Sequence, residues 1–171
     1  IAEHPEWNVP AGTLRLDPGH LRRHARQVKR TANRRFWNDE TGRFYACIDK
    51  NGNRHDYGYT FLNLDSIWYG LADEPHARGI LDWIRGERII EGDTSTGADI
   101  YRWRFGPRAT TRRNVDWYGF MWHGPESIPW GGQVQDGGAV LGFSFYDLWA
   151  RLKWVGPDDA WDRLVEILAW E

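Results

Sequence analysis

The chain has 171 residues, of which 41% are hydrophobic and 27% are charged, and its formal net charge is -2. This length and apolar content are sufficient for one globular domain and exclude an intrinsically disordered chain. No run of about 18 apolar residues occurs, so the sequence predicts no membrane span.

A first helix is predicted from Gly19 to Phe36, where apolar residues recur at helical spacing. The other positions hold seven basic residues and no acid, and the pattern favours a solvated basic face. The alternative is nucleic-acid binding, but the chain is net acidic and carries no known binding motif, so we expect no nucleic-acid partner. His20 and His24 lie one turn apart without a third ligand in view, and we expect no metal.

A β-hairpin is predicted next, because Phe44, Ala46 and Ile48 alternate and Asn51-Gly52 is typical of a two-residue hairpin turn. The one cysteine of the chain, Cys47, excludes an internal disulfide and leaves the compartment open. Since the chain does not begin with Met, we expect that a leader or a longer preceding region has been removed.

Two similar helix-turn-helix units follow, over residues 60–86 and 139–171. Aligning Ala77 with Ala160 superposes them. In the second unit, the first helix is apolar almost all round, with Leu141, Phe145, Leu148 and Leu152 on one face, whereas the second helix is apolar on one face only. Such a repeat is typical of a double ring in which inner helices face one another and outer helices cover them.

Residues 87–136 separate the two units and show little helical period. Four of the 12 tryptophans lie in this stretch, at positions 103, 117, 122 and 130, and argue against disorder. Trp faces stack on sugar rings, and 12 exceed the number that packing alone needs in a domain of this size, which favours a flat, rigid ligand. A long ordered loop is usually functional, so we expect the site here.

The chain resembles the six-hairpin glycosidase superfamily, whose (α/α)6 toroids include glycoside hydrolases and cellobiose-type disaccharide phosphorylases. The resemblance is carried by "HDYGYTFLNLDSIWYGLADEPHARGILDWI" and "GGQVQDGGAVLGFSFYDLWARLKWVGPDDAWDRLVEIL". It implies an all-α fold, made of helical hairpins of part of the ring with a small β-hairpin and long rim loops. Residues 1–171 would then be a single domain or a fragment of a larger catalytic domain, completed by the remainder of the polypeptide or by a second chain.

Glycosidic cleavage needs a carboxylic acid that protonates the leaving oxygen and a second carboxylate on the other side of the sugar. The resemblance to the Gly-Asp motif of the phosphorylases makes Asp93 the first candidate for the acid. The Trp-Asn-Asp that follows this motif in the phosphorylases is replaced here by Thr94, Ser95 and Thr96. Asp99 is an alternative in the same loop.

Two further catalytic candidates lie later in the loop. Glu126 stands between two prolines and is flanked by Trp122 and Trp130, a setting that would desolvate the carboxyl and raise its pKa. Asp136 is expected at the mouth of the next helix, where the helix dipole suits a base or an acceptor for a sugar hydroxyl. An ordinary N-cap is the alternative for Asp136, and a turn-capping carboxylate is the alternative for Glu126.

Sugar contacts are expected from polar and aromatic residues around these carboxylates. The Gly-Gly pairs at 131–132 and 137–138 are interpreted as letting the backbone pass close to a sugar. The five arginines between positions 102 and 113 either bind an anionic group or pair with the acids of the loop. The predicted substrate-binding residues are Asp56, Tyr57, Arg108, Trp117, Trp122, His123, Trp130, Gln133 and Gln135.

The leading hypothesis is a glycoside hydrolase that acts on an oligosaccharide or glycoside, without a metal or another cofactor. One alternative is a disaccharide phosphorylase with Arg108, Thr110, Thr111 and His123 as phosphate contacts. The other is a non-catalytic partial toroid that binds carbohydrate by Trp stacking. We expect a carbohydrate substrate, no nucleic acid and no membrane as partners.

Overall fold

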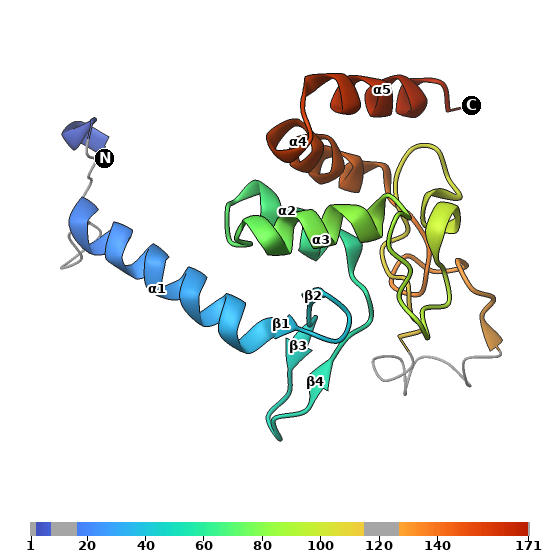
Figure 1. Cartoon of the computed structure of the whole chain (residues 1–171), viewed down its shortest axis with the longest axis horizontal. Coiled ribbons are helices and arrows are strands. Elements are labelled where there is room, and N and C mark those ends of the chain that lie inside the picture. The colour runs from blue at the N-terminus through green and yellow to red at the C-terminus, as the bar shows by residue number, and fades with distance from the viewer. Residues whose placement is uncertain (1–2, 8–16, 115–126, 171) are drawn as a thin grey trace.

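The chain is mainly helical, as expected. The computed structural model describes residues 3–7, 17–114 and 127–170, and within them it contains five α-helices and two small antiparallel sheets of two strands each (Figure 1). Short 3-10 helices lie at Pro5–Trp7 (η1), Gly97–Tyr101 (η2) and Leu141–Phe143 (η4). In the part of the chain that the structure describes, no helix combines the length and apolarity needed to cross a membrane.

Helix α1 (Pro18–Phe36) begins where the Asp17 side chain accepts hydrogen bonds from the Gly19 and His20 backbone. It contains no buried residue, and it projects from the rest of the molecule in Figure 1. Its C-terminal half is fixed by Lys29 Nζ, which donates to the carbonyl of Gly70 at 2.9 Å. Six of the seven basic side chains are exposed, so the basic outer face predicted from the amphipathic pattern is present; they are Arg22, Arg23, Arg26, Arg30, Arg34 and Arg35.

The strands follow directly. Strand β1 (Trp37–Asn38) pairs with β2 (Arg43–Phe44), and β3 (Cys47–Ile48) pairs with β4 (Arg54–His55), so the predicted hairpin is confirmed in β3 and β4. The predicted two-residue turn is wrong. The Asp49 carboxylate accepts hydrogen bonds from the backbone of Asn51 and Asn53, which organises a longer loop.

Two helical hairpins form the body: α2 (Thr60–Trp68) with α3 (Glu74–Ile84), and α4 (Ser144–Trp154) with α5 (Pro157–Leu168). The second helix of each hairpin has a proline in its first turn. The hydrophobic core is centred on α2 and α3. Large side chains are almost fully buried there, among them Leu64, Ile67, Ile80, Trp83 and Ile84.

Helices α2 and α4 lie side by side and run parallel. At their starts, Thr60 Oγ1 donates to the carbonyl of Arg108 and Ser144 Oγ donates to that of Phe105, so both helices begin at one loop segment. At their ends, Lys153 Nζ in α4 donates to the Ile67 and Trp68 carbonyls of α2, both at 3.0 Å. The first helices of the two hairpins are therefore direct neighbours (Figure 1).

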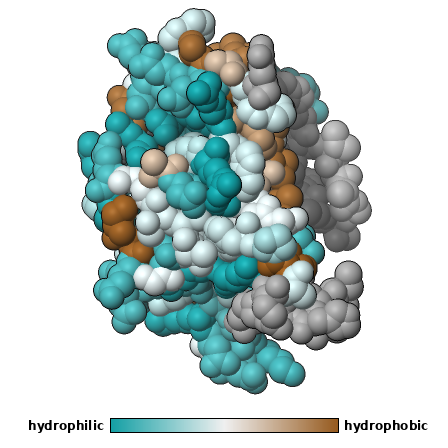
Figure 2. Space-filling model, turned by 90° about the vertical axis from the view of Figure 1, so that its right-hand side faces the viewer, coloured by the Kyte–Doolittle hydropathy of each residue, from teal (hydrophilic) through white to brown (hydrophobic). Residues whose placement is uncertain are grey.

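Helix α4 differs from the prediction of a helix buried all round. Its buried side carries polar groups beside the core residue Ala150: the fully buried Asp147 accepts hydrogen bonds from Arg151 Nε at 2.8 Å, Arg163 Nε at 2.9 Å and Tyr101 Oη at 3.0 Å. Its apolar side is open, and Phe145 is 50% exposed. Figure 2 shows the face that lies on the right-hand side of Figure 1, and hydrophobic residues form a band along one edge of it.

Candidate functional site

The loop between α3 and η4 packs against the N-terminal ends of α2 and α4. Although it has little regular secondary structure, its backbone is bonded to distant segments: Thr60 N donates to the Ala109 carbonyl at 3.0 Å, and Ala109 N donates to the Gly138 carbonyl at 2.7 Å. Thr111 N donates to the carbonyl of Gly58. The described part of this loop is therefore ordered, as its tryptophans predicted.

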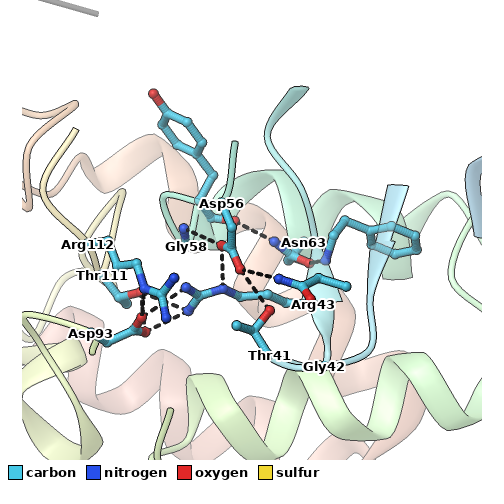
Figure 3. Close-up of polar contacts among 12 residues, drawn as sticks. Thr41, Gly42, Arg43, Asp56, Gly58, Asn63, Asp93, Thr111 and Arg112 are labelled. Carbon is cyan, nitrogen blue, oxygen red and sulfur yellow. Dashed lines mark hydrogen bonds and ion pairs between the residues drawn. The ribbon is translucent and has the colours of Figure 1, made fainter. Parts of the chain in front are cut away.

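The Arg43 cluster, made of Arg43, Asp56, Asp93, Thr111 and Arg112, joins this loop to strand β2 (Figure 3). Arg43 is fully buried and spans two carboxylates. Its Nε lies 2.7 Å from Asp56 Oδ1, and its Nη1 and Nη2 lie 2.6 and 2.9 Å from the two oxygens of Asp93. Such a two-pronged guanidinium–carboxylate pair fixes both geometry and charge.

Asp93, the first candidate for the acid, is held in this cluster. Thr111 Oγ1 donates to its Oδ2 at 2.6 Å and Arg112 Nε donates to its Oδ1 at 2.7 Å. Burial acts to raise the pKa of Asp93, but the hydrogen bonds and charge of Arg43, with those of Thr111 and Arg112, outweigh it and lower the pKa. A general acid must carry a proton at working pH, so this geometry favours a structural role for Asp93.

Two predicted substrate contacts also lie in the interior. The Asp56 side chain is 6% exposed, and besides Arg43 it accepts hydrogen bonds from Thr41, Asn38 and the backbone of Gly58. Tyr57 is 5% exposed and its hydroxyl lies 3.1 Å from His55 Nδ1. Both side chains are therefore buried in the framework below the loop.

The Asp136 cluster, made of Asp136, Arg113, Asn114 and Tyr59, lies at the other end of the loop. Asp136 is fully buried and its Oδ1 accepts a hydrogen bond from Asn114 N at 3.0 Å. Arg113 Nη1 lies 3.0 Å from Oδ2, an ionic contact that lacks hydrogen-bond alignment, so Oδ2 accepts no hydrogen bond from the described residues. Asn114 Nδ2 donates to Tyr59 Oη at 2.7 Å.

Asp136 does not lie at a helix mouth, so that expectation is wrong. Helix α4 begins at Ser144, its N-cap is Phe143, and η4 intervenes from Leu141. Instead the segment folds back on itself, because Asp136 N donates to the Gln133 carbonyl at 3.1 Å. The carboxylate caps the backbone of Asn114, which is 22 residues distant.

The Gly-Gly pairs serve the packing of the chain itself. Gly137 has φ +81°, and a Cβ on it would clash with the Trp130 ring; a Cβ on Gly138 would lie 2.6 Å from the Gln133 carbonyl oxygen. The interpretation that these glycines make room for a sugar is therefore wrong for this pair, because protein atoms occupy the space.

Three of the five loop arginines, Arg108, Arg112 and Arg113, pair with acids of the loop, which was the alternative to an anion site. Arg108, 1% exposed, donates to the Gly137 carbonyl at 2.6 Å and contacts Asp99 Oδ1 at 3.2 Å. Its guanidinium also stacks over Trp103, 4.7 Å from the ring centroid. Arg112 Nε donates to Asp93 at 2.7 Å, whereas Arg113 makes an ionic contact with Asp136 at 3.0 Å without hydrogen-bond alignment.

Asp99, the alternative acid, has a lowered pKa. Burial alone would raise the pKa of Asp99, but hydrogen bonds from Ser95 and Arg108 and the charges of Arg108 and Arg102 outweigh it. The predicted phosphate contacts Thr110 and Thr111 are fully buried, like Arg108. None of these three side chains presents a free donor to a bound phosphate.

Three predicted sugar contacts remain at least partly exposed and belong to one short segment of the chain: Trp130, Gln133 and Gln135. Trp130 Nε1 donates to Ser95 Oγ at 2.7 Å, which fixes the indole. The predicted residues Trp117, Trp122, His123 and Glu126 lie outside the described residues. The sequence did not identify Arg43, Tyr59 and Asn114 as members of these clusters. Only Arg43 could have been noticed, because it is a charged residue beside the predicted strand residue Phe44.

The described residues contain no group of three or more His, Cys, Asp or Glu side chains that could hold a metal ion. Comparisons of the chain with protein-family models, with curated proteins and with solved structures found no match. A function for this chain is therefore inferred from its residues and their geometry.

Proposed function

We propose that this chain belongs to a glycoside hydrolase of the six-hairpin type, which cleaves the glycosidic bonds of an oligosaccharide or glycoside by carboxylate acid/base catalysis. The observation that carries the proposal is the Asp136 cluster. A fully buried carboxylate with one oxygen free of hydrogen bonds lies in an ordered loop at the shared end of two parallel helices. Buried polar groups of this kind are rare and are typical of functional sites.

In this proposal Asp136 accepts a proton or a sugar hydroxyl at Oδ2. Arg113 lies beside that oxygen and balances its charge, while its Nη1 and Nη2 donate to the Ile128 carbonyl at 3.1 and 3.0 Å, so Oδ2 keeps its hydrogen-bonding capacity for a hydroxyl. Glu126 is the acid, as its sequence setting predicted. Trp130, Gln133 and Gln135 supply a ring face and amide groups of the kind that bind sugars.

The exposed apolar side of α4 supports a larger ring. Leu141 and Phe145 are 53% and 50% exposed, and Leu152 is 43% exposed. Burying one such side chain contributes about 1.5–3 kcal/mol, so a neighbouring hairpin would gain by packing here. Further hairpins, from the remainder of the polypeptide or from a second chain, would complete the toroid.

A second candidate is a non-catalytic carbohydrate-binding partial toroid. It is favoured by the arginines that lower the pKa of both Asp93 and Asp99, since neither carboxyl then suits a general acid. The phosphorylase alternative has less support, because Arg108, Thr110 and Thr111 are buried among protein groups.

The test is sugar release from a panel of oligosaccharides and aryl glycosides, with and without phosphate, by this chain and by a longer polypeptide that contains it. We expect release without phosphate, reduced at least 10²-fold by Asp136→Asn and by Glu126→Gln. The matched control is Asp162→Asn, a change of an exposed carboxylate on α5, which should leave release unchanged.

Three outcomes separate the candidates. Release that depends on phosphate would favour the phosphorylase. Sugar binding without release from either polypeptide would favour the binding module. Release that survives Asp136→Asn in a folded protein would remove Asp136 from the reaction.

A further inference from the structure

A second site lies away from the loop. A pocket of about 430 Å³ is enclosed by the C-terminal half of α1, by β2 and its following residues, and by α2. Its walls are apolar and rich in aromatic rings, with Phe36, Phe44, Tyr45, Tyr69 and Leu62 among them. One carboxylate, Asp65, enters this lining from α2.

Asp65 has no counter-ion. Its Oδ1 is buried and accepts no hydrogen bond, and no ion pair to it exists among the described residues. Burial raises the pKa of the Asp65 carboxyl. The hydroxyl of Ser66, the polar neighbour in the lining, is already used, because it donates to the Asn63 carbonyl at 2.6 Å.

Cations on the neighbouring elements serve other partners, and Lys153 Nζ, for example, donates to the carbonyls of Ile67 and Trp68. Lys29 Nζ is bound to the carbonyls of Gly70 and Ala72. Arg54 stacks over the ring of Tyr45, with its guanidinium carbon 5.5 Å from the ring centroid. A partly buried carboxylate without a compensating charge is costly, and a cation that binds beside it removes that cost.

We propose that this pocket binds a small organic ammonium ion with an apolar body, and that Asp65 is its counter-ion. The ammonium group donates a charge-assisted hydrogen bond to the carboxylate, and aromatic faces attract the same charge. The apolar body fills the space between α1 and α2. A sugar suits this pocket poorly, because Asp65 and Ser66 cannot satisfy several hydroxyl groups.

This site is independent of the proposed glycosidase activity, since it shares no residue with the loop. Its test uses 2-phenylethylammonium as the probe and 2-phenylethanol as the matched neutral analogue, each titrated into the whole chain and followed by calorimetry and by the NMR signals of Tyr45 and Tyr69. We expect the ammonium to bind at least about tenfold more tightly than the alcohol.

Two variants locate the site. Asp65→Asn should abolish the preference for the ammonium while the protein stays folded, because the change removes an unpaired charge. Ala32→Phe, which fills the pocket from α1 and leaves Asp65 in place, should abolish binding of both probes. The control Asp162→Asn should keep the preference intact.

Equal affinity of the two probes for the unaltered chain would overturn the proposal, as would the absence of saturable binding. A preference for the ammonium that survives Asp65→Asn would overturn the assignment of Asp65. Binding that survives Ala32→Phe would place the ligand elsewhere on the chain.

Discussion

Arg43 and Asp93 are separated by 50 residues in the sequence, yet they form a two-pronged ion pair in which both side chains are fully buried. The pair fastens the loop after α3 to strand β2, and the same guanidinium also holds Asp56. The geometry of the loop therefore depends on a residue far outside it.

Replacing Arg43 by Met should strongly destabilise the chain, because the buried Asp56 then loses its ion-pair partner and the buried Asp93 keeps only Arg112. Breaking one side of a buried pair costs about 3–5 kcal/mol, and we expect a loss of at least that size in the free energy of unfolding. Urea denaturation followed by Trp fluorescence measures it. The control is Arg78→Met, whose exposed pair with Glu74 should contribute less than about 1 kcal/mol. Equal losses in the two variants would contradict the structural role of the Arg43 cluster.

The stability of the chain should fall in acid partly because of Asp93. Its folded-state pKa lies below the unfolded value of about 3.9, so its contribution is present above pH ~4 and is lost as the pH falls through the folded-state pKa. We expect Asp93→Asn to be less stable at pH 7 and to show a shallower decline between about pH 4 and 2. Chemical denaturation at a series of pH values tests this. An unchanged slope would mean that Asp93 is not ion-paired in solution.

The Asp65 carboxyl should act in the opposite direction. Because burial raises its folded-state pKa, the ionised form disfavours the fold above that pKa, and the penalty disappears as the pH falls. Asp65→Asn is therefore expected to raise the melting temperature at pH 7 and to change it little at pH 3. A lower melting temperature at pH 7 would show that Asp65 has a stabilising partner.

Gly137→Ala should destabilise the loop for two reasons, a positive φ and a clash with the Trp130 ring. A variant at Gly52 separates the two effects, since Gly52 has φ +87° but an added Cβ there would meet no atom within 4 Å. We expect Gly52→Ala to cost about 1–2 kcal/mol, and Gly137→Ala to cost about 1–3 kcal/mol more. Denaturant unfolding of both variants gives the difference. Equal costs would mean that Trp130 does not pack on Gly137.

Tyr101→Phe should cost about 1–2 kcal/mol of unfolding free energy, because the hydroxyl donates to buried Asp147 and accepts from Arg151. The matched control is Tyr69→Phe, since Tyr69 is 75% exposed and should tolerate the change. Thermal and urea unfolding measure both. A neutral effect of Tyr101→Phe would show that water replaces the hydroxyl in this network.

The helices could be predicted from sequence because their signals are local. The spacing of apolar residues predicted α1 from Gly19 to Phe36, and the structure has it from Pro18 to Phe36. The β3–β4 hairpin was equally predictable from its local sequence. The length of its loop was not, because the Asp49 side chain organises more residues than an Asn-Gly turn contains.

The candidate site was harder to predict, because it depends on contacts between distant residues. Nothing near Asp93 in the sequence shows that Arg43 will neutralise it, and nothing near Gly137 shows that the Trp130 ring will cover it. The prediction that α4 is buried on all sides was wrong for another reason. The sequence pattern shows that this helix is apolar on several faces, but it does not show that the side with Asp147 is the one covered in the described structure.

The backbone hydrogen bonds of the loop have a consequence for exchange with solvent. The amides of Arg108, Ala109, Thr111 and Arg112 donate to carbonyls of Ile100, Gly138, Gly58 and Tyr57, although no helix or extended sheet contains them. Their deuterium uptake should thus be as slow as that of the α2 interior, and they should exchange together with it as one cooperative unit. This part of the loop then behaves as a rigid wall beside any ligand, and closure over a ligand has to come from another part of the molecule.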